Sequence, residues 1–306
     1  MFSPEARAGT ELRAQRIQGL PGTRSERAGI ALVLAATACF AGLDSTAKAV
    51  GAAVPVLMAM WFRYLLQAMA TGALVIARRG PGAFATRHPI LHVLRGVLFT
   101  SAGAMAFLSL RWLPVGEFTA LQMLTPLLVT LLAATQLGER VSTLRWALVA
   151  GSFGGALLVI QPDARDIKWA MLLPLALVGV NAAYQVLTSV LVREDEPGTL
   201  QLWTGIVATV LTTMALPWAG EWPAQRSLWA LLGLMAVFST LGHALLTQAY
   251  RHASASTLTP FLYAQVGFAT LAGWLVFGHK PDFWTLLGIV VIAGCGAAGT
   301  WRAARA

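Results

Sequence analysis

The stretch TALQMLTPLLVTLLAATQLGER, from Thr119 to Arg140, decides the fold. Residues Phe118–Gly138 carry no charged side chain, yet Pro126 lies in the middle of this apolar run and Gln122 adds a polar side chain. A second stretch, TPFLYAQVGFATLAGWLVFGHK, Thr259–Lys280, begins 140 residues later and has the same length. Runs of this length can cross the hydrocarbon core of a bilayer, about 30 Å, as helices. Both stretches are therefore predicted to be membrane spans.

The composition is that of a polytopic membrane protein. Of the 306 residues, 57% are hydrophobic and only 11% are charged, whereas charged residues make up about a quarter of an ordinary soluble domain. Two apolar runs, Val54–Ala77 and Ile90–Leu110, are interrupted by Arg63 and Arg95. The runs without any Asp, Glu, Lys or Arg are Ala28–Leu43, Phe118–Gly138, Trp146–Pro162, Trp169–Val192, Pro197–Gly220, Ser227–Tyr250, Ala253–Gly278 and Phe283–Trp301. Together they predict an all-α membrane protein with ten transmembrane helices.

The distribution of positive charge predicts the orientation. The net charge is +9, and most of the 22 Lys and Arg residues fall in residues 1–27, in the loops after even-numbered spans and at the C-terminus. Lys and Arg concentrate in cytoplasmic loops. We therefore expect both termini in the cytoplasm and the chain in the bacterial inner membrane as a multi-pass protein. Residues 1–27 are interpreted as a basic cytoplasmic tail, because no secretory cleavage site follows them.

The two halves of the chain align span for span at an offset of 140 to 142 residues. The aligned pairs are Thr46 with Thr188, Pro55 with Pro197, Trp61 with Trp203, Thr71 with Thr213, Arg111 with Arg251, Thr119 with Thr259, Gly138 with Gly278 and Gly154 with Gly294. Each half has five predicted spans, so the second half must enter the membrane from the opposite side. Inverted repeats of this kind are typical of secondary transporters. We expect a first repeat over residues 28–162 and a second over residues 163–306.

One segment also resembles a known family. LRWLPVGEFTALQMLTPLLVTLLAATQLGERVSTLRWALVAGSFGGALLVIQP, with its Leu-Pro turn, Leu-X-Pro, Gly-Glu-Arg and glycine-rich end, resembles the first repeat of the EamA-type drug/metabolite transporter superfamily. FRYLL and LRG, further towards the N-terminus, resemble it too. The second repeat departs from the pattern, with Val266 where the family often has Pro and Gly278-His279 in place of Gly-Glu. The resemblance implies ten spans, cytoplasmic termini and a central cavity lined mainly by spans one, three, four, six, eight and nine.

Arg63 is a candidate substrate-binding residue because it lies inside a predicted span. An arginine at mid-membrane costs roughly 2.5–3.5 kcal/mol on insertion scales, so it requires a partner or a hydrated cavity. Its planar guanidinium can bind a substrate carboxylate. The alternative is a structural contact that fixes the interface between the repeats.

Asp44 and Lys48 are four residues apart near the end of the first span. On a helix this spacing brings an acid and a base onto one face. The pair could open to engage the amine and the carboxylate of a zwitterion. The alternative is a salt bridge at the rim of the membrane. Glu117 is interpreted as a helix N-terminal acid near the positive end of the helix dipole.

Polar residues in the fourth span form one stripe. Thr119, Gln122, Pro126 and Thr130 follow at spacings of 3, 4 and 4, and Thr125 lies beside them. Pro126 removes the backbone donor that would satisfy the carbonyl of Gln122, and water in a cavity or a polar side chain can replace that donor. We expect this stripe to face a hydrated core and Pro126 to act as a hinge. The alternative is hydrogen bonding between helices.

Further candidates lie on the spans of the second repeat. They are Asn181, Tyr184 and Gln185 on the sixth span, His243 on the eighth, and Tyr263 and Gln265 on the ninth, where Pro260 is a second candidate hinge. Amides, hydroxyls and aromatic rings thus converge at mid-depth, which predicts a substrate site. His243 could shuttle protons, or it could be a packing residue.

Several protein classes are excluded by missing motifs. The chain has no HExxH, GxSxG, P-loop or paired carboxylates on one helix face, which argues against an enzyme, a catalytic residue or a bound cofactor. Cys39 and Cys295 both lie in predicted spans, where they suit packing rather than a disulfide or a metal site. Without a nucleotide-binding motif, transport must be secondary or facilitated.

These observations predict a secondary transporter of a small metabolite. Arg63, Lys48, Asp44 and many amides favour a carboxylated or zwitterionic compound, such as an amino acid or an opine-type metallophore. The family resemblance implies export as the direction. The alternative is an importer of riboflavin or S-adenosylmethionine, as relatives in the family import both. A passive channel, an intramembrane enzyme and an assembly subunit are less favoured. Nucleic acid is not an expected partner.

The fifth and tenth spans carry almost no hydrogen-bonding residues. They show Gly151-xxx-Gly155 and Gly294-xxx-Ala298 instead, a pattern that allows close approach of two helices. A homodimer through these two spans is a further expectation.

Overall fold

The computed structural model describes residues 23–51, 53–112, 121–139, 141–160, 172–218, 225–278 and 280–303. All regular structure in these ranges is helical. The α-helices are α2 (Thr23–Gly51), α3 (Val56–Arg79), α4 (Pro89–Trp112), α6 (Thr125–Gln136), α7 (Thr143–Ile160), α8 (Leu172–Leu191), α9 (Pro197–Ala215), α10 (Arg226–His252), α11 (Ala255–Leu262), α12 (Ala264–Phe277) and α13 (Phe283–Ala303), with short 3-10 helices η1 (Gly80–Phe84) and η3 (Leu216–Trp218). The first helix begins at Thr23 and so includes the last residues of the predicted tail.

The helices agree with the predicted spans. Six of those in the described ranges are long and apolar enough to cross a membrane: α2, α3, α4, α8, α9 and α10. The fourth, fifth and tenth predicted spans contain shorter apolar helices, Thr125–Gln136, Thr143–Val159 and Phe283–Ala298. The ninth span is divided between α11 and α12. The all-α, ten-segment architecture is thus confirmed.

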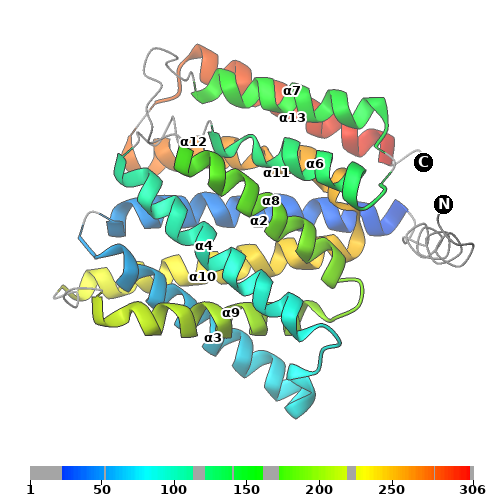
Figure 1. Cartoon of the computed structure of the whole chain (residues 1–306). Coiled ribbons are helices and arrows are strands. Elements are labelled where there is room, and N and C mark those ends of the chain that lie inside the picture. Colours follow the sequence, from blue (N-terminus) through cyan, green and yellow to red (C-terminus); the bar gives the residue numbers. More distant parts are fainter. Residues whose placement is uncertain are drawn as a thin grey trace, which may run out of the picture.

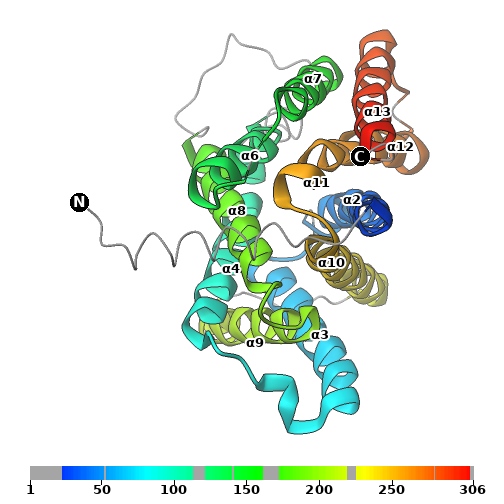
Figure 2. The ribbon, with the colours of Figure 1, turned by 90° about the vertical axis from the view of Figure 1, so that its right-hand side faces the viewer.

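Helices of the two halves pack in equivalent pairs. The most extensive contact joins α2 to α10, and its counterpart joins α8 to α4; α3 packs on α9, and α7 packs on α13. Figure 2 shows α7 and α13 at one edge of the bundle and α3 and α9 at the other. Because each helix packs on one from the other half, the interior of the bundle is formed by both halves together.

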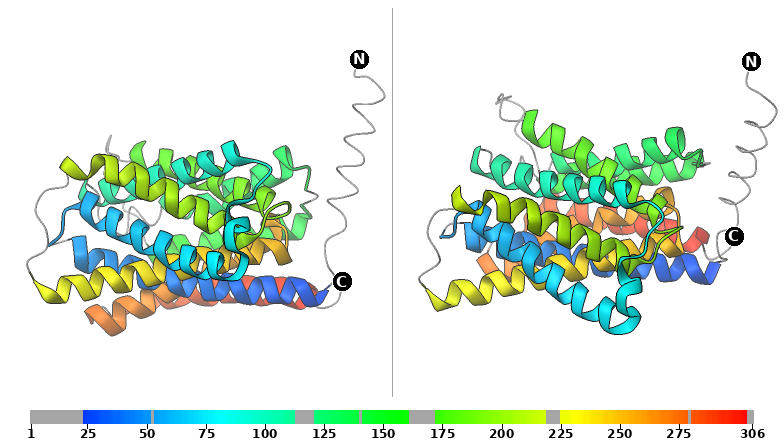
Figure 3. Two further views of the ribbon diagram at one scale, coloured as in Figure 1. Left: turned by 90° about the horizontal axis from the view of Figure 1, so that it is seen from below. Right: turned by 60° about the horizontal axis from the view of Figure 1, so that its bottom comes forward.

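The bundle has two distinct ends, because its helices run along roughly one direction (Figure 3). We call the end where α2 begins and α13 finishes the terminal end, and the opposite end the distal end (Figure 1). Ser25 at the start of α2 bonds to His252 at the finish of α10, with 3.0 Å between Oγ and Nδ1. The α8–α9 turn lies at the terminal end, and the α2–α3 turn lies at the distal end.

The fourth and ninth spans are both broken, and the breaks touch each other. A turn at Met123–Leu124 precedes α6, which has Pro126 in its first turn. The break between α11 and α12 falls at Tyr263, three residues after Pro260. The hydroxyl of Tyr263 donates to the carbonyl of Met123 at 3.0 Å. Since a proline cannot donate to the backbone ladder, Pro126 gives the break in the fourth span a local cause, and discontinuous helices are common at transporter binding sites.

Close helix packing joins α7 to α13 within the chain. A Cβ atom on Gly155 would lie 2.8 Å from the carbonyl oxygen of Gly288, and one on Gly151 would lie 2.8 Å from Sγ of Cys295. The backbones therefore approach as closely as small-residue motifs allow. These glycines are used inside the chain, and the homodimer through α7 and α13 stays a prediction.

Candidate functional site

A cavity of about 240 Å³ lies in the distal half of the bundle. Its lining comes from α2, α3, α4, the turn before α6 and the start of α6, and from α8, α10, α11 and α12. The lining residues are Phe40, Leu43, Asp44, Ala47, Arg63, Gly103, Ala106, Phe107, Gln122, Met123, Thr125, Pro126, Leu177, Asn181, Gln185, Leu246, Leu262 and Gln265. These include most of the predicted site residues. They also come from the spans that the resemblance implies, with Arg63 added from α3.

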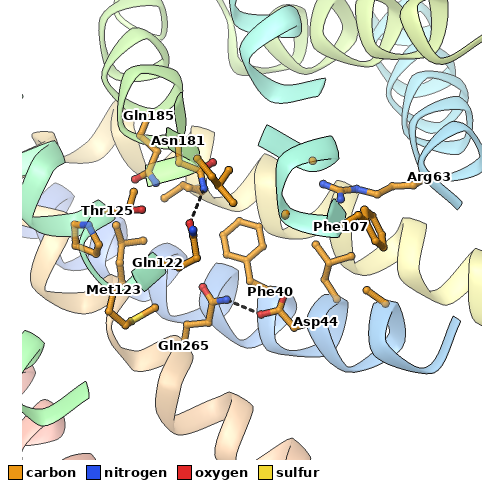
Figure 4. A pocket seen from close by; sticks show the side chains of 18 residues that line it. Phe40, Asp44, Arg63, Phe107, Gln122, Met123, Thr125, Asn181, Gln185 and Gln265 are labelled. Atoms are coloured by element: carbon orange, nitrogen blue, oxygen red, sulfur yellow. Dashed lines mark hydrogen bonds between the residues drawn. The ribbon is translucent and has the colours of Figure 1, made fainter. Parts of the chain in front are cut away.

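Amide side chains form one wall of the cavity (Figure 4). Asn181 on α8 donates through Nδ2 to Oε1 of Gln122 at 3.4 Å. Gln122 in turn donates to the carbonyl of Pro174 at 3.2 Å. Gln185 accepts a hydrogen bond from the Tyr250 hydroxyl at 3.0 Å. An amide has both a donor and an acceptor, so each retains capacity towards a ligand.

A second polar contact crosses the cavity between α2 and α12. Nε2 of Gln265 donates to Oδ2 of Asp44 at 2.8 Å. Gln265 and Gln122 lie at nearly equivalent places in the two repeats, and each bonds to the first helix of a repeat. Within the described residues Lys48, one turn beyond Asp44, is exposed and outside the cavity wall.

Arg63 is buried, with 7% of its surface exposed, and it points into the cavity (Figure 4). Its Nε donates to Oγ of Ser239 on α10 at 2.6 Å. The guanidinium also lies over the rings of Tyr64 and Phe99, at 5.1 and 5.4 Å. In the described part of the chain its terminal nitrogens have no hydrogen-bond partner. One edge of the guanidinium is thus anchored on α10, and a substrate-binding role for Arg63 stays a prediction.

Comparison with known proteins decides the family. The model of the EamA-like transporter family matches the chain twice, over residues 27–161 and 168–299. The chain belongs to the EamA-like transporter family. The riboflavin transporter of Rhizobium johnstonii is 33% identical over 221 residues, which are 71% of this chain and 72% of that protein. The pseudopaline exporter CntI of Pseudomonas aeruginosa UCBPP-PA14 is 26% identical, over 88% of this chain and 95% of that protein.

Two further comparisons agree. An S-adenosylmethionine uptake transporter of Rickettsia bellii is 26% identical over 70% of this chain and 73% of that protein. A solved crystal structure superposes with a TM-score of 0.75 at 18% identity, covering 93% of this chain and 99% of that chain, which shows the fold alone. These relatives are transporters rather than enzymes. This EamA-like protein is therefore a multi-pass membrane transporter of a small molecule.

Several predicted site residues lie behind the cavity wall of this transporter. The ring of His243 packs between Phe40, which lines the cavity, and Phe99, with ring centroids 4.9 and 4.6 Å apart. Tyr184 lies next to His243, at 6.0 Å, and Tyr263 is held at the helix breaks. A proton-shuttle role for His243 stays a prediction. Among the described ranges no group of three His, Cys, Asp or Glu side chains could hold a metal ion. The predicted positions Glu117 and Thr119 lie outside the described residues.

The sequence analysis assigned no role to Arg95, although this residue interrupts the predicted third span. Arg95 is completely buried, and its donors bind side chains and a carbonyl of the second repeat. They contact Oγ1 of Thr188 at 2.8 Å, the carbonyl of Leu200 at 2.8 Å, Oγ1 of Thr204, the hydroxyl of Tyr184 at 2.9 Å and Oγ1 of Thr247 at 3.3 Å. The available signal was the set of hydroxyl residues on spans six, seven and eight.

Charged contacts at the terminal end were missed as well. Asp195, in the α8–α9 turn, accepts from Nε2 of His92 at 2.8 Å and from Oγ1 of Thr86 at 2.6 Å. Burial tends to raise the pKa of Asp195, but the hydrogen bonds from Thr86 and His92 outweigh it and lower that pKa below its ordinary value. Glu139 bonds to Arg193 at 3.3 Å, which gives the Gly-Glu-Arg segment a tie to the same turn.

Proposed function

We propose that this transporter takes up a riboflavin-like metabolite, a flat heteroaromatic molecule with a hydroxylated side chain. The observation that carries the proposal is the amide-rich lining of the cavity, which places four amides and two phenylalanine rings around one space. Amides pair with the alternating donors and acceptors at the edge of such a heterocycle. Phenylalanine rings stack on its faces. The riboflavin transporter among the relatives supports this choice.

The charges on the wall also support an uncharged ligand. Asp44 already bonds to Gln265, and Arg63 is anchored on Ser239. One acid and one base on the same wall leave little net charge. We further propose that the terminal end faces the cytoplasm of a bacterial inner membrane, so that the distal cavity receives its ligand from outside.

The test is rescue of a riboflavin auxotroph. Cells that express the chain should need at least about tenfold less external riboflavin for growth, and the Gln122→Ala variant should lose that advantage. Gln248→Ala is the matched control, because Gln248 is an amide on α10 outside the cavity wall, facing His252. Purified protein should quench riboflavin fluorescence on binding. If the protein is well folded in the membrane but gives neither rescue nor quenching, the flavin proposal is overturned.

A zwitterionic amino-acid derivative is the second candidate, with export as its direction. The observation in its favour is that Arg63 and Asp44 both line the cavity, where they could hold a carboxylate and an amine. The pseudopaline exporter among the relatives is consistent with it. Mass spectrometry of cytosol and medium, with and without the chain, would show such a compound accumulating inside cells that lack the transporter.

A further inference from the structure

A polar stripe runs along one face of α4, from the terminal end towards the cavity. It starts at His88, the residue before α4, and continues with His92 and Arg95 at spacings of 4 and 3; Phe99 follows four residues later on the same face. Gly103, one turn beyond, lines the cavity. The stripe therefore occupies the half of the interior that the cavity does not reach.

The outer part of the stripe holds the α8–α9 turn. The pair His92–Asp195 is almost completely buried, with side-chain exposures of 0% and 8%. Thr86, just before α4, bonds to the same carboxylate oxygen. The neighbouring pair His88–Glu194 is also close, at 2.6 Å, but its side chains are 40% and 53% exposed. A buried contact and an exposed contact thus lie side by side between the two repeats.

The inner part of the stripe is Arg95, whose partners lie on α8, α9 and α10. All of them belong to the second repeat, and all of those described are hydroxyls or a carbonyl. Neutral partners of this kind can be exchanged for water without leaving a buried carboxylate unpaired. The hydrogen bonds of Arg95 can therefore hold the helices together and still be broken when the helices separate.

The distal end has no counterpart to this arrangement among the described residues. The turn equivalent to Arg193–Glu196 is Gly51–Val54, which contains no charged residue. The cavity reaches towards that end along α2, at Asp44 and Ala47. Among the described residues, the carboxylates of the α8–α9 turn thus join the two repeats at the terminal end, whereas the distal contacts Arg63–Ser239 and Asp44–Gln265 each have a neutral partner.

We propose that the polar stripe of α4 is the gate of the terminal end. Transport requires Asp195 to separate from His92 and Thr86, and Arg95 to release the hydroxyls of α8, α9 and α10, so that the cavity opens to the terminal side. The proposal rests on the transport function proposed above, but not on the identity of the substrate.

The first test links the gate covalently. Thr86→Cys and Asp195→Cys, in a chain whose Cys39 and Cys295 are replaced by alanine, are joined with a short disulfide-forming bifunctional thiol reagent. Riboflavin is the probe, measured by fluorescence binding and by flux into proteoliposomes. The linked protein should still bind riboflavin but lose at least about tenfold in flux, and a reductant should restore the flux. Unchanged flux in the linked protein would overturn the gate.

The second test uses no substrate, so its result does not depend on whether riboflavin is the molecule transported. Hydrogen exchange of the backbone amides of α4 near His92 and Arg95 is measured in the full-length parent protein and in two variants at adjacent positions, 194 and 195. Asp195→Asn removes the buried acid, and Glu194→Gln removes the exposed one. The gate predicts exchange at least about tenfold faster in Asp195→Asn and little changed in Glu194→Gln. Equal exchange in both variants would overturn it.

Discussion

The two ends of the bundle share a fold but differ in chemistry. At the distal end an amide-lined cavity separates helices of the two repeats, and the guanidinium of Arg63 points into it. At the terminal end the equivalent space is filled by Arg95 and its hydroxyl partners, below the buried His92–Asp195 pair. The two repeats therefore share one helix arrangement. The side chains that differ between them leave a cavity at the distal end and fill the terminal end.

The largest effect is expected from removal of the inner contact. Arg95→Ala leaves several buried hydroxyls without their donor, and hydrogen bonds to a charged group contribute about 1.5–3 kcal/mol each. We expect a loss of at least about 3 kcal/mol in stability, seen as a much lower melting temperature in detergent. A variant that melts like the parent protein would show that Arg95 does not hold the terminal end.

The second arginine should behave in the opposite way. Arg63→Ala should disturb the fold less than Arg95→Ala, because the described contacts of Arg63 are one hydrogen bond to Ser239 and two ring contacts, but it removes donors from the cavity. We expect ligand affinity to fall about tenfold to a hundredfold while the melting temperature changes little, the reverse of Arg95→Ala. A titration with riboflavin measures the affinity. If both arginine variants lose stability equally, the distinction between the two ends fails.

The contact between the helix breaks should have an intermediate effect. Tyr263→Phe removes only the hydroxyl that donates to Met123, and a typical hydrogen bond contributes about 0.5–1.5 kcal/mol. We expect a stability loss of about 1 kcal/mol and a lower transport rate, because both broken spans lose a common support. Thr270→Val is the matched control, since that hydroxyl bonds within α12, to the carbonyl of Val266, away from the break. The same loss of rate in the control would show that the breaks have no special role.

The smallest effect concerns pH. The pKa of Asp195 is lower in the folded protein, so its stabilising contribution is present above the ordinary pKa of an aspartate, about 3.9. It is lost as the pH falls through the lowered value. The melting temperature of Asp195→Asn should therefore fall less steeply below about pH 4 than that of the parent. Parallel curves would contradict this.

Much of the fold could be predicted from the sequence. Uncharged runs and the constant offset between halves indicated ten segments in two repeats, and Pro126 indicated the break in the fourth span. Part of the cavity wall could also be predicted, because Gln122, Asn181 and Gln265 are amides in otherwise apolar spans. These signals are local, and burial in a bilayer makes them strong.

Other features depend on which helices meet. Arg95 has the same sequence context as a charge at a membrane boundary, and only packing against α8, α9 and α10 shows that it is buried. Asp195 lies in a charged turn, RED, whose neighbours Arg193 and Glu194 are exposed. His243 and Tyr184 were expected in the wall but lie behind it, because helix rotation decides which face of a polar span is lined by the cavity.

The most direct measurement compares access to the cavity from the two sides of the membrane. Gln265→Cys, in the protein without Cys39 and Cys295, is placed in oriented vesicles and treated with a membrane-impermeant thiol reagent from either side. We predict fast labelling from the distal side and slow labelling from the terminal side, with Asp195→Asn raising the terminal rate. Equal or faster labelling from the terminal side in the parent protein would contradict a molecule that is open at one end and sealed at the other.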